Sequence, residues 1–174
     1  AVLGSKIEEV EKILKDNQSN FEAQVANDNS EGQIVISGKT KDLQTLSEFL
    51  KENRIKNIKL PVSAPFHCSL MSKATDVMTK ELEKINFKHS KNTLISNVTA
   101  DEVSNVEDLK SLLIKQIEKK VRWRESILYM INKGVNQFIE IGPGKVLSGL
   151  VKRINKDVKI SSINSQSDIE SLEI

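Results

Sequence analysis

One histidine of this chain stands in a setting that suits a catalytic base. His67 is one of two histidines, and it lies in residues 60–71, LPVSAPFHCSLM, shortly after Pro61 and Pro65. Each proline fixes its own φ angle and pushes the preceding residue toward extended geometry, so the segment predicts a loop of defined direction. An imidazole held in one orientation can transfer protons near neutral pH. A structural histidine bonded to a backbone carbonyl is the alternative interpretation.

The residue beside this histidine does not supply its partner. Adjacent side chains point to opposite faces of an extended segment and lie about 100° apart on a helix, so Cys68 and His67 cannot form a hydrogen-bonded dyad. We predict that Cys68 packs as a small apolar residue. The sequence contains no Gly-x-Ser-x-Gly elbow for a nucleophilic serine. The chain therefore holds a plausible base without a recognisable nucleophile.

Three amide side chains are further candidates. Gln116 falls on the apolar stripe of a predicted helix over residues 106–119, where it is either a satisfied core residue or part of a turn that presents polar groups to a site. Asn27 ends an expected strand and Asn29 opens the predicted hairpin turn at residues 29–32, where such residues are common turn formers. They could also line a cleft.

The GPGK sequence and the second histidine are better explained by structural roles than by chemistry. The sequence GPGK at residues 142–145 lacks the spacing of a phosphate-binding loop, and tight strand-to-helix packing is the better interpretation. His89 lies in the polar stretch KHSK and is predicted to be solvated. Two histidines and one cysteine provide too few of the usual zinc ligands, so we expect no metal site.

Composition narrows the class of protein. The 174 residues suit one domain or two small ones, and 38% hydrophobic with 29% charged residues indicate a globular chain. A net charge of +2 and 4% aromatic residues argue against a nucleic-acid binder. No apolar run reaches transmembrane length and no signal peptide opens the chain, so we expect no membrane segment. A single cysteine suits a reducing compartment such as the cytoplasm.

The first sixty residues alternate in a recognisable order. Apolar spacing and turn residues predict the order β-α-β-β-α-β, which is that of a ferredoxin-like unit, closed by Pro61. Ser5 and Glu8 form a capping-box pattern for the first helix. The expected strands span residues 1–4, 21–27, 33–38 and 55–60, and the expected helices begin at residues 5 and 40.

The remainder predicts strands separated by helices, a pattern typical of a parallel, doubly wound sheet. The expected strands span residues 94–98, 138–141 and 160–163, and the expected helices 70–85, 106–119, 124–133 and 145–155. Such a sheet is thin for parallel pairing, which needs both faces covered. The apolar start without Met suggests a fragment, and we expect the missing strands in sequence before residue 1.

Taken together, these motifs resemble the C-terminal half of malonyl-CoA:acyl carrier protein transacylases. The resemblance rests on residues 60–71, residues 27–38, the sequence VRW at residues 121–123 and EIGPGKVL at residues 140–147. It implies an α/β fold in which residues 1–60 form a ferredoxin-like small domain. Residues 61–174 would then be the C-terminal part of a large α/β-hydrolase-like acyltransferase domain.

The resemblance also implies an enzyme. Members of the family transfer a malonyl group from malonyl-CoA to acyl carrier protein in fatty acid biosynthesis, by a ping-pong mechanism through an acyl-serine and without a cofactor. His67 matches the family's catalytic histidine, and Gln116 matches the position whose backbone carbonyl orients it. Asn27 and Asn29 match positions near the substrate cleft. Phe66 matches a position where, in related polyketide acyltransferases, Phe accompanies malonyl and Ser methylmalonyl.

The resemblance leaves part of the family's machinery without a counterpart. The nucleophilic serine, an oxyanion-hole glutamine and a malonate-binding arginine belong to the first half of the family's sequence, so we expect this chain alone to be inactive. Residues 118–120, EKK, depart from the family's usual pattern after Gln116. A non-catalytic fragment that binds the carrier protein is the main alternative, and a degraded gene product is another. Exposed cations would carry such binding: Lys145, Lys152, Arg153, Lys156 and Lys159.

Overall fold

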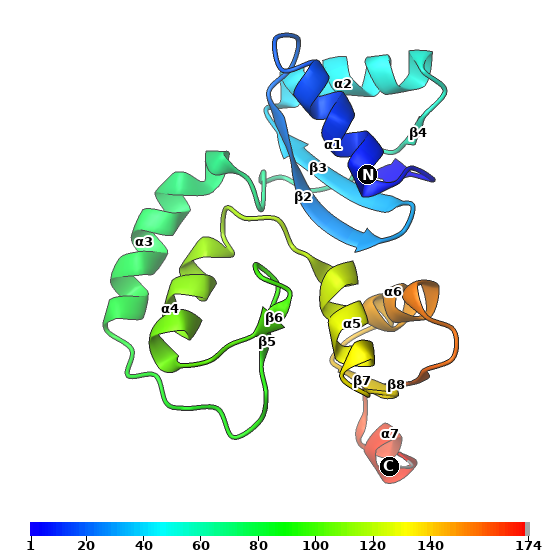
Figure 1. Cartoon of the computed structure of the whole chain (residues 1–174). Helices are drawn as coiled ribbons and strands as arrows, with labels where there is room; N and C mark the ends of the chain where they lie inside the picture. The colour runs from blue at the N-terminus through cyan, green and yellow to red at the C-terminus, as the bar shows by residue number, and fades with distance from the viewer. Residues whose placement is uncertain (173–174) are drawn as a thin grey trace. The chain divides into compact units, whose positions relative to one another are not determined.

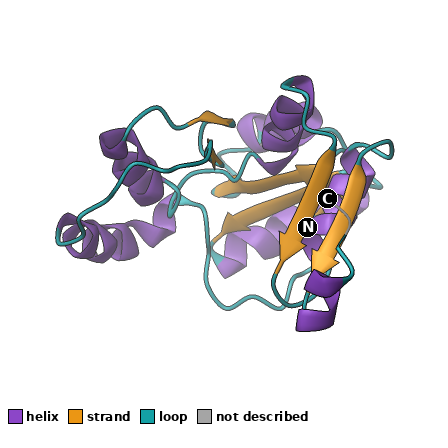
Figure 2. Ribbon diagram, turned by 90° about the horizontal axis from the view of Figure 1, so that it is seen from below, coloured by secondary structure: helices purple, strands orange, loops and turns teal. Residues whose placement is uncertain are grey.

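The structure is a computed structural model that describes residues 1–172. The chain divides into two compact units, Ala1–Ser126 and Ile127–Ile174, and each is considered by itself. Figure 1 traces the chain from its N-terminus in blue to its C-terminus in red. Helices and strands are mixed throughout, as in an α/β fold (Figure 2).

The first unit opens with a four-stranded sheet in the strand order β2-β3-β1-β4. All of its paired strands run antiparallel, and β2 and β3 form a long hairpin (Figure 1). The order of elements is the predicted β-α-β-β-α-β. Their bounds are β1 Val2–Leu3, α1 Ile7–Asp16, β2 Ala23–Ser30, β3 Gln33–Gly38, α2 Thr40–Glu52 and β4 Lys56–Asn57.

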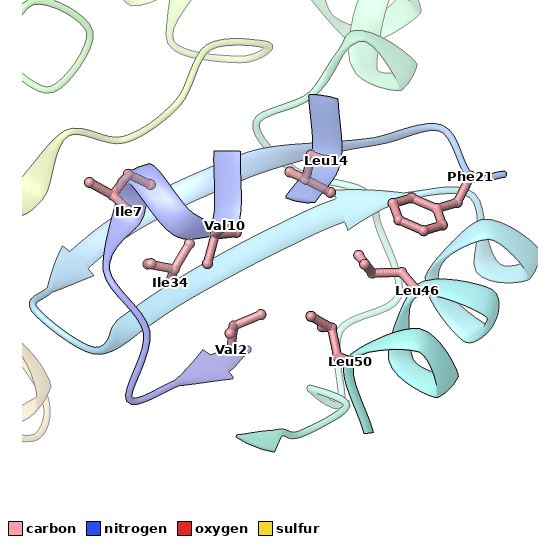
Figure 3. Packing of buried hydrophobic residues seen from close by; sticks show 8 residues of the cluster. All are labelled: Val2, Ile7, Val10, Leu14, Phe21, Ile34, Leu46 and Leu50. Carbon is pink, nitrogen blue, oxygen red and sulfur yellow. The ribbon is translucent and has the colours of Figure 1, made fainter. Parts of the chain in front are cut away.

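One apolar cluster holds this sheet and its two helices together. Helix α1 contributes residues at helical spacing, and α2 adds two residues four positions apart, so each helix turns one stripe toward the sheet. Figure 3 shows these side chains gathered between α1, α2 and the strands. Full burial of each large side chain is worth about 1.5–3 kcal/mol. The cluster consists of Val2, Ile7, Val10, Leu14, Phe21, Ile34, Leu46 and Leu50.

The start of α1 and the end of β2 differ from the predictions. The cap of α1 is Lys6 rather than Ser5, because the carboxylate of Glu9 accepts a hydrogen bond from the Lys6 N–H at 3.1 Å. Strand β2 continues to Ser30, so the hairpin turn is shorter than predicted and is formed at residues 31–32. Gly32 has φ +73°, a conformation in which glycine lacks the steric penalty of other residues.

The rest of the first unit is mainly helical. It contains the 3₁₀ helix η1 Ser69–Met71, α3 Ser72–Glu83, β5 Ile95–Ser96, β6 Asp101–Glu102 and α4 Val106–Lys115. The prediction of a parallel strand at residues 94–98 is wrong. Strand β5 pairs antiparallel with β6 because the chain reverses at residues 97–100, where the Ala100 N–H bonds the Ser96 carbonyl at 2.8 Å.

The second unit contains a parallel strand pair. Helix α5, Trp123–Asn132, runs from the end of the first unit into the second. Strand β7, Gln137–Ile141, pairs parallel with β8, Lys159–Ile163, and α6, Val146–Ile154, connects them. These elements confirm the strands predicted at residues 138–141 and 160–163. The short helix α7, Gln166–Glu170, follows, and none of the helices in residues 1–172 has the length and apolar character needed to cross a bilayer.

A buried ion pair joins the hairpin to the start of α5. The backbone of Val121 lies beside β2, where its N–H bonds the Ala26 carbonyl at 2.8 Å and its carbonyl accepts from the Asp28 N–H at 2.9 Å. The Asp28 side chain is fully buried, and its carboxylate accepts from Nε and Nη2 of Arg124 at 3.0 and 2.9 Å. This hydrogen bond to Asp28 raises the pKa of the Arg124 guanidinium. The pair therefore anchors the chain that follows α4.

We expect Asp28→Asn to lower the free energy of unfolding by about 3 kcal/mol, because a buried pair loses one charge while Arg124 stays partly buried. Urea denaturation of the chain followed by circular dichroism measures the change. Glu22→Gln is the matched control, since Glu22 pairs with Lys39 on the surface and its loss costs about 0.5 kcal/mol or less. Equal losses in the two variants would contradict the assigned weight of the buried pair.

Candidate functional site

The candidate base sits on strained backbone. His67 lies in the connection between β4 and η1, and its φ angle is +60°, in the left-handed region. For a residue with a Cβ atom this conformation costs on the order of 1–2 kcal/mol. Such strain persists only where surrounding contacts maintain it, and it concentrates at functional sites. Contacts with the surrounding structure must therefore maintain the backbone conformation of His67.

The ring of His67 has one defined partner. Its Nδ1 lies 2.7 Å from the backbone carbonyl oxygen of Gln116, 49 residues away in the sequence. A carbonyl oxygen only accepts, so Nδ1 carries the proton and donates it. In the neutral ring, Nε2 then holds the free lone pair, which is the requirement for a general base. The structure thus brings together His67 and the Gln116 carbonyl, the two groups that the family resemblance pairs.

Helix α4 ends in a way that makes this carbonyl available. The helix stops at Lys115 and Gln116 is its C-cap, so the Gln116 carbonyl belongs to the last turn, where carbonyls lack helical partners. The next carbonyl, of Ile117, accepts from the His67 backbone N–H at 3.2 Å. The end of α4 therefore binds both the ring and the backbone of His67.

The side chain of Gln116 does not play the role that its place in the apolar stripe suggested. It is half-buried, and its Nε2 donates to the carbonyl of Lys119 at 3.3 Å. Of the two alternatives, the side chain is not a core amide. The helix ends before Gln116, so this residue lies on a turn and the periodic pattern no longer describes its backbone. The part of Gln116 that faces His67 is the carbonyl.

The neighbours of His67 take different environments. Cys68 is 1% exposed and its Sγ–H donates to the carbonyl of Pro65 at 3.2 Å, which confirms that it packs in the interior. Phe66 is 50% exposed, and its ring centroid lies 6.4 Å from that of His67. An exposed aromatic ring therefore stands next to the candidate base.

The two asparagines lie within a strand rather than around a turn. Asn27 is opposite Val35 in β3 and forms a bridge with Val121, and Asn29 lies at a shift in the β2–β3 register. Neither side chain hydrogen-bonds to His67 within residues 1–172. The bridge between Asn27 and Val121 does bring β2 close in space to the loop that follows Gln116.

A hollow of about 380 Å³ borders His67. Its walls come from α1, from the first residues of β2 and from the loop after α4. Lys120 of that loop pairs with Glu11 of α1 at 2.8 Å, and Glu118 accepts from the hydroxyl of Thr75 on α3 at 2.5 Å. These two contacts hold the EKK segment, residues 118–120, against α1 and α3. Sequence reasoning missed Gln24 and Glu118 in this wall, and no local pattern marks either.

The GPGK sequence forms a tight turn before α6. The carboxylate of Glu140 accepts from the N–H groups of Leu147 and Ser148, at 3.1 and 2.7 Å, in the first turn of that helix. Hydrogen bonds from Ser148, with a further one from Leu147, hold the pKa of Glu140 below its usual range. The chain's own carboxylate thus occupies the place where a phosphate would bind, which favours strand-to-helix packing.

Comparison with known proteins identifies related sequences and structures. The family model for an acyl transferase domain matches residues 5–172. The malonyl CoA-acyl carrier protein transacylase of Bacillus subtilis (strain 168) is 42% identical over 98% of this chain and 54% of its own length, and that of Staphylococcus aureus (strain COL) is 38% identical over 98% and 56%. The chain spans about half the length of these curated relatives.

Two solved structures extend the comparison. The malonyl CoA-acyl carrier protein transacylase of Clostridium perfringens superposes with a TM-score of 0.91 at 42% identity, covering 98% of this chain and 54% of that one. A malonyl-transacylase in complex with its type II polyketide acyl-carrier protein gives a TM-score of 0.91 at 30% identity, covering 98% and 55%. With a family model that matches nearly every residue, the α/β chain that holds His67 against Gln116 belongs to the acyl transferase domain family.

Proposed function

We propose that this chain is the C-terminal portion of an enzyme that transfers a malonyl group from malonyl-CoA to acyl carrier protein in fatty acid biosynthesis. The observation that carries the proposal is the contact of His67 Nδ1 with the Gln116 carbonyl, which leaves Nε2 as the base. The similarity of the chain to named malonyl transacylases supports the substrates. The single free cysteine suits a cytoplasmic setting.

In each of the two half-reactions of the proposed mechanism, His67 acts once as a base and once as an acid. Nε2 accepts the proton of a serine hydroxyl supplied by the other portion of the enzyme, and the serine oxygen attacks the malonyl thioester. The C–S bond then breaks, and His67 returns the proton to the departing thiol of coenzyme A. In the second half Nε2 takes the proton of the carrier's thiol, whose sulfur attacks the acyl-serine. His67 then reprotonates the serine oxygen as the C–O bond breaks.

The Gln116 carbonyl serves every step of this cycle. It accepts from Nδ1–H in the neutral ring and in the imidazolium, and the bond strengthens when the ring becomes charged. An Asp carboxylate plays this part in other triads. A carbonyl carries no net charge, so here its contribution is orientation and a partial charge.

We further propose the domain assignment implied by the resemblance. Residues 1–60 are a ferredoxin-like small domain, which the strand order β2-β3-β1-β4 and the two helices α1 and α2 support. Residues 61–174 are the C-terminal part of the large α/β-hydrolase-like domain, and the parallel pair β7–β8 is consistent with its sheet. Exposed apolar side chains in each unit, such as Val77 at 63% and Ile141 at 79%, suit burial against the other half of the enzyme.

Three residues are proposed to bind the substrate. The exposed ring of Phe66, next to His67, would restrict space beside the acyl group and so favour malonyl over methylmalonyl. Asn27 and Asn29 are assigned to the substrate cleft by the family resemblance, and the bridge from Asn27 to Val121 is compatible with that place.

A carrier-binding fragment without catalysis is the second candidate. It is favoured by the exposed basic residues on α6 and around it, which suit an acidic carrier protein. A similar malonyl-transacylase has been solved with its carrier protein. This candidate requires binding that weakens with salt and does not depend on His67. The exposed cations include Lys145, Lys152, Lys156 and Lys159.

We predict that the 174-residue chain alone does not transfer malonyl groups, because it lacks the nucleophile. Incubation with malonyl-CoA and carrier protein, followed by mass spectrometry of the carrier, measures this. Addition of the N-terminal half that carries the serine is expected to produce malonyl-carrier. Transfer by the chain alone would refute the assignment of the nucleophile to the other half.

In the complete enzyme we expect His67→Ala to lower kcat/KM by about 10³-fold or more, since members of a triad act as a unit. Gln116→Ala should stay within about threefold of the parent, because the orienting group is a backbone carbonyl. His89→Ala is the matched control, since this histidine is exposed on a loop. A near-parental rate for His67→Ala would remove His67 from the mechanism.

A further inference from the structure

The peptide group just before His67 is held at both of its polar atoms. Its carbonyl, that of Phe66, accepts from the hydroxyl of Ser37 on β3 at 2.7 Å. Its N–H, that of His67, donates to the backbone carbonyl of Ile117, which follows α4, at 3.2 Å. A peptide unit is planar, so two bonds at its opposite ends fix the orientation of the whole plane. The φ angle of His67 is measured from that plane, so holding the plane fixes one of the two sides of the dihedral.

The backbone just after His67 is held from the neighbouring strand. The N–H of Ser69 donates to Oε1 of Gln24 on β2 at 2.8 Å. Between these two hydrogen-bonded positions the Cys68 side chain is buried, and its Sγ–H donates a hydrogen bond to the Pro65 carbonyl. The backbone on both sides of His67 is therefore tied to the β2–β3 hairpin, while the ring itself is tied to α4.

The two hairpin residues form a single unit. Gln24 and Ser37 are directly opposite one another in the β2–β3 ladder, and opposite residues of antiparallel strands point to the same face. One cross-strand pair thus contacts the chain before and after the histidine. These contacts maintain a left-handed backbone at a residue whose Cβ atom disfavours it.

We propose that Gln24 and Ser37 are positioning residues that hold the backbone of His67 in its left-handed conformation and thereby aim Nε2. The hydrogen bonds of both side chains go to the backbone on either side of His67, so both act through His67. Their catalytic consequence rests on the proposed function, whereas their effect on the backbone does not. The two consequences are therefore tested separately.

Hydrogen exchange of the 174-residue chain, observed by NMR, tests the backbone effect. Ser37→Ala is expected to speed exchange of the His67 amide, and Gln24→Leu that of the Ser69 amide, each by about tenfold. Ser37→Thr and Gln24→Glu keep the hydroxyl and the acceptor oxygen and should restore the parental rates. Unchanged exchange at these amides, or a uniform rise throughout the sheet, would overturn the proposal.

Kinetics of the complete enzyme test the catalytic effect. Ser37→Ala and Gln24→Leu are expected to lower kcat by about three- to tenfold with KM unchanged, and Ser37→Thr and Gln24→Glu to recover it. In a His67→Ala background neither change should lower the residual rate further, because no base remains to be aimed. Gln44→Leu, on the exposed face of α2, is the control.

The two tests separate the two hypotheses. An assembled parental enzyme without malonyl transfer would refute the proposed function, while the exchange rates would still decide whether Gln24 and Ser37 hold His67. Equal losses of kcat in the His67 and His67→Ala backgrounds would overturn the positioning role, because a general structural defect acts in both.

Discussion

The hydrogen bond from His67 Nδ1 to the Gln116 carbonyl is the interaction on which the proposed chemistry depends. It selects the tautomer with the lone pair on Nε2, so a single 2.7 Å contact makes the ring a base of defined direction. Because the acceptor is a backbone carbonyl, its position is determined by where α4 ends rather than by any side chain. The site is thus sensitive to the fold around Gln116 and insensitive to the identity of that residue.

Much of the first unit can be understood as support for that contact. The end of α4 leads to Val121, whose backbone joins the edge of β2, and Asp28 with Arg124 secures the chain just beyond. The backbone on both sides of His67 bonds to the same hairpin through Ser37 and Gln24. The β2–β3 hairpin therefore holds both participants of the hydrogen bond, which explains why a sheet formed from residues 1–57 matters to a histidine outside it.

Local patterns predicted the elements well and the long-range contacts poorly. Alternating and helical apolar spacing identified the hairpin and α1, because burial on one face imposes those periods. The prolines identified the loop of His67. The same periodicity extended the expected helix to residue 119, whereas α4 ends at Lys115. Bonds of the i→i+3 type at residues 117 and 118 tighten and end the helix without a break in the apolar stripe. Ser37 and Gln24 contact a segment 29 and 45 residues away, and no local signal marks such partners.

The contacts that orient the candidate base, His67, all come from this chain. Each group that fixes His67, from the Gln116 and Ile117 carbonyls to Ser37 and Gln24, lies within residues 24–117. In the proposed mechanism, the nucleophile from the other portion of the enzyme therefore has no part in orienting the imidazole and needs only to reach Nε2. Preorganised donors and acceptors lower a barrier because they need no rearrangement during the reaction. In a site divided in this way, the folding of one segment bears the free-energy cost of orienting the imidazole. Association of the two portions then has only to align the serine with Nε2.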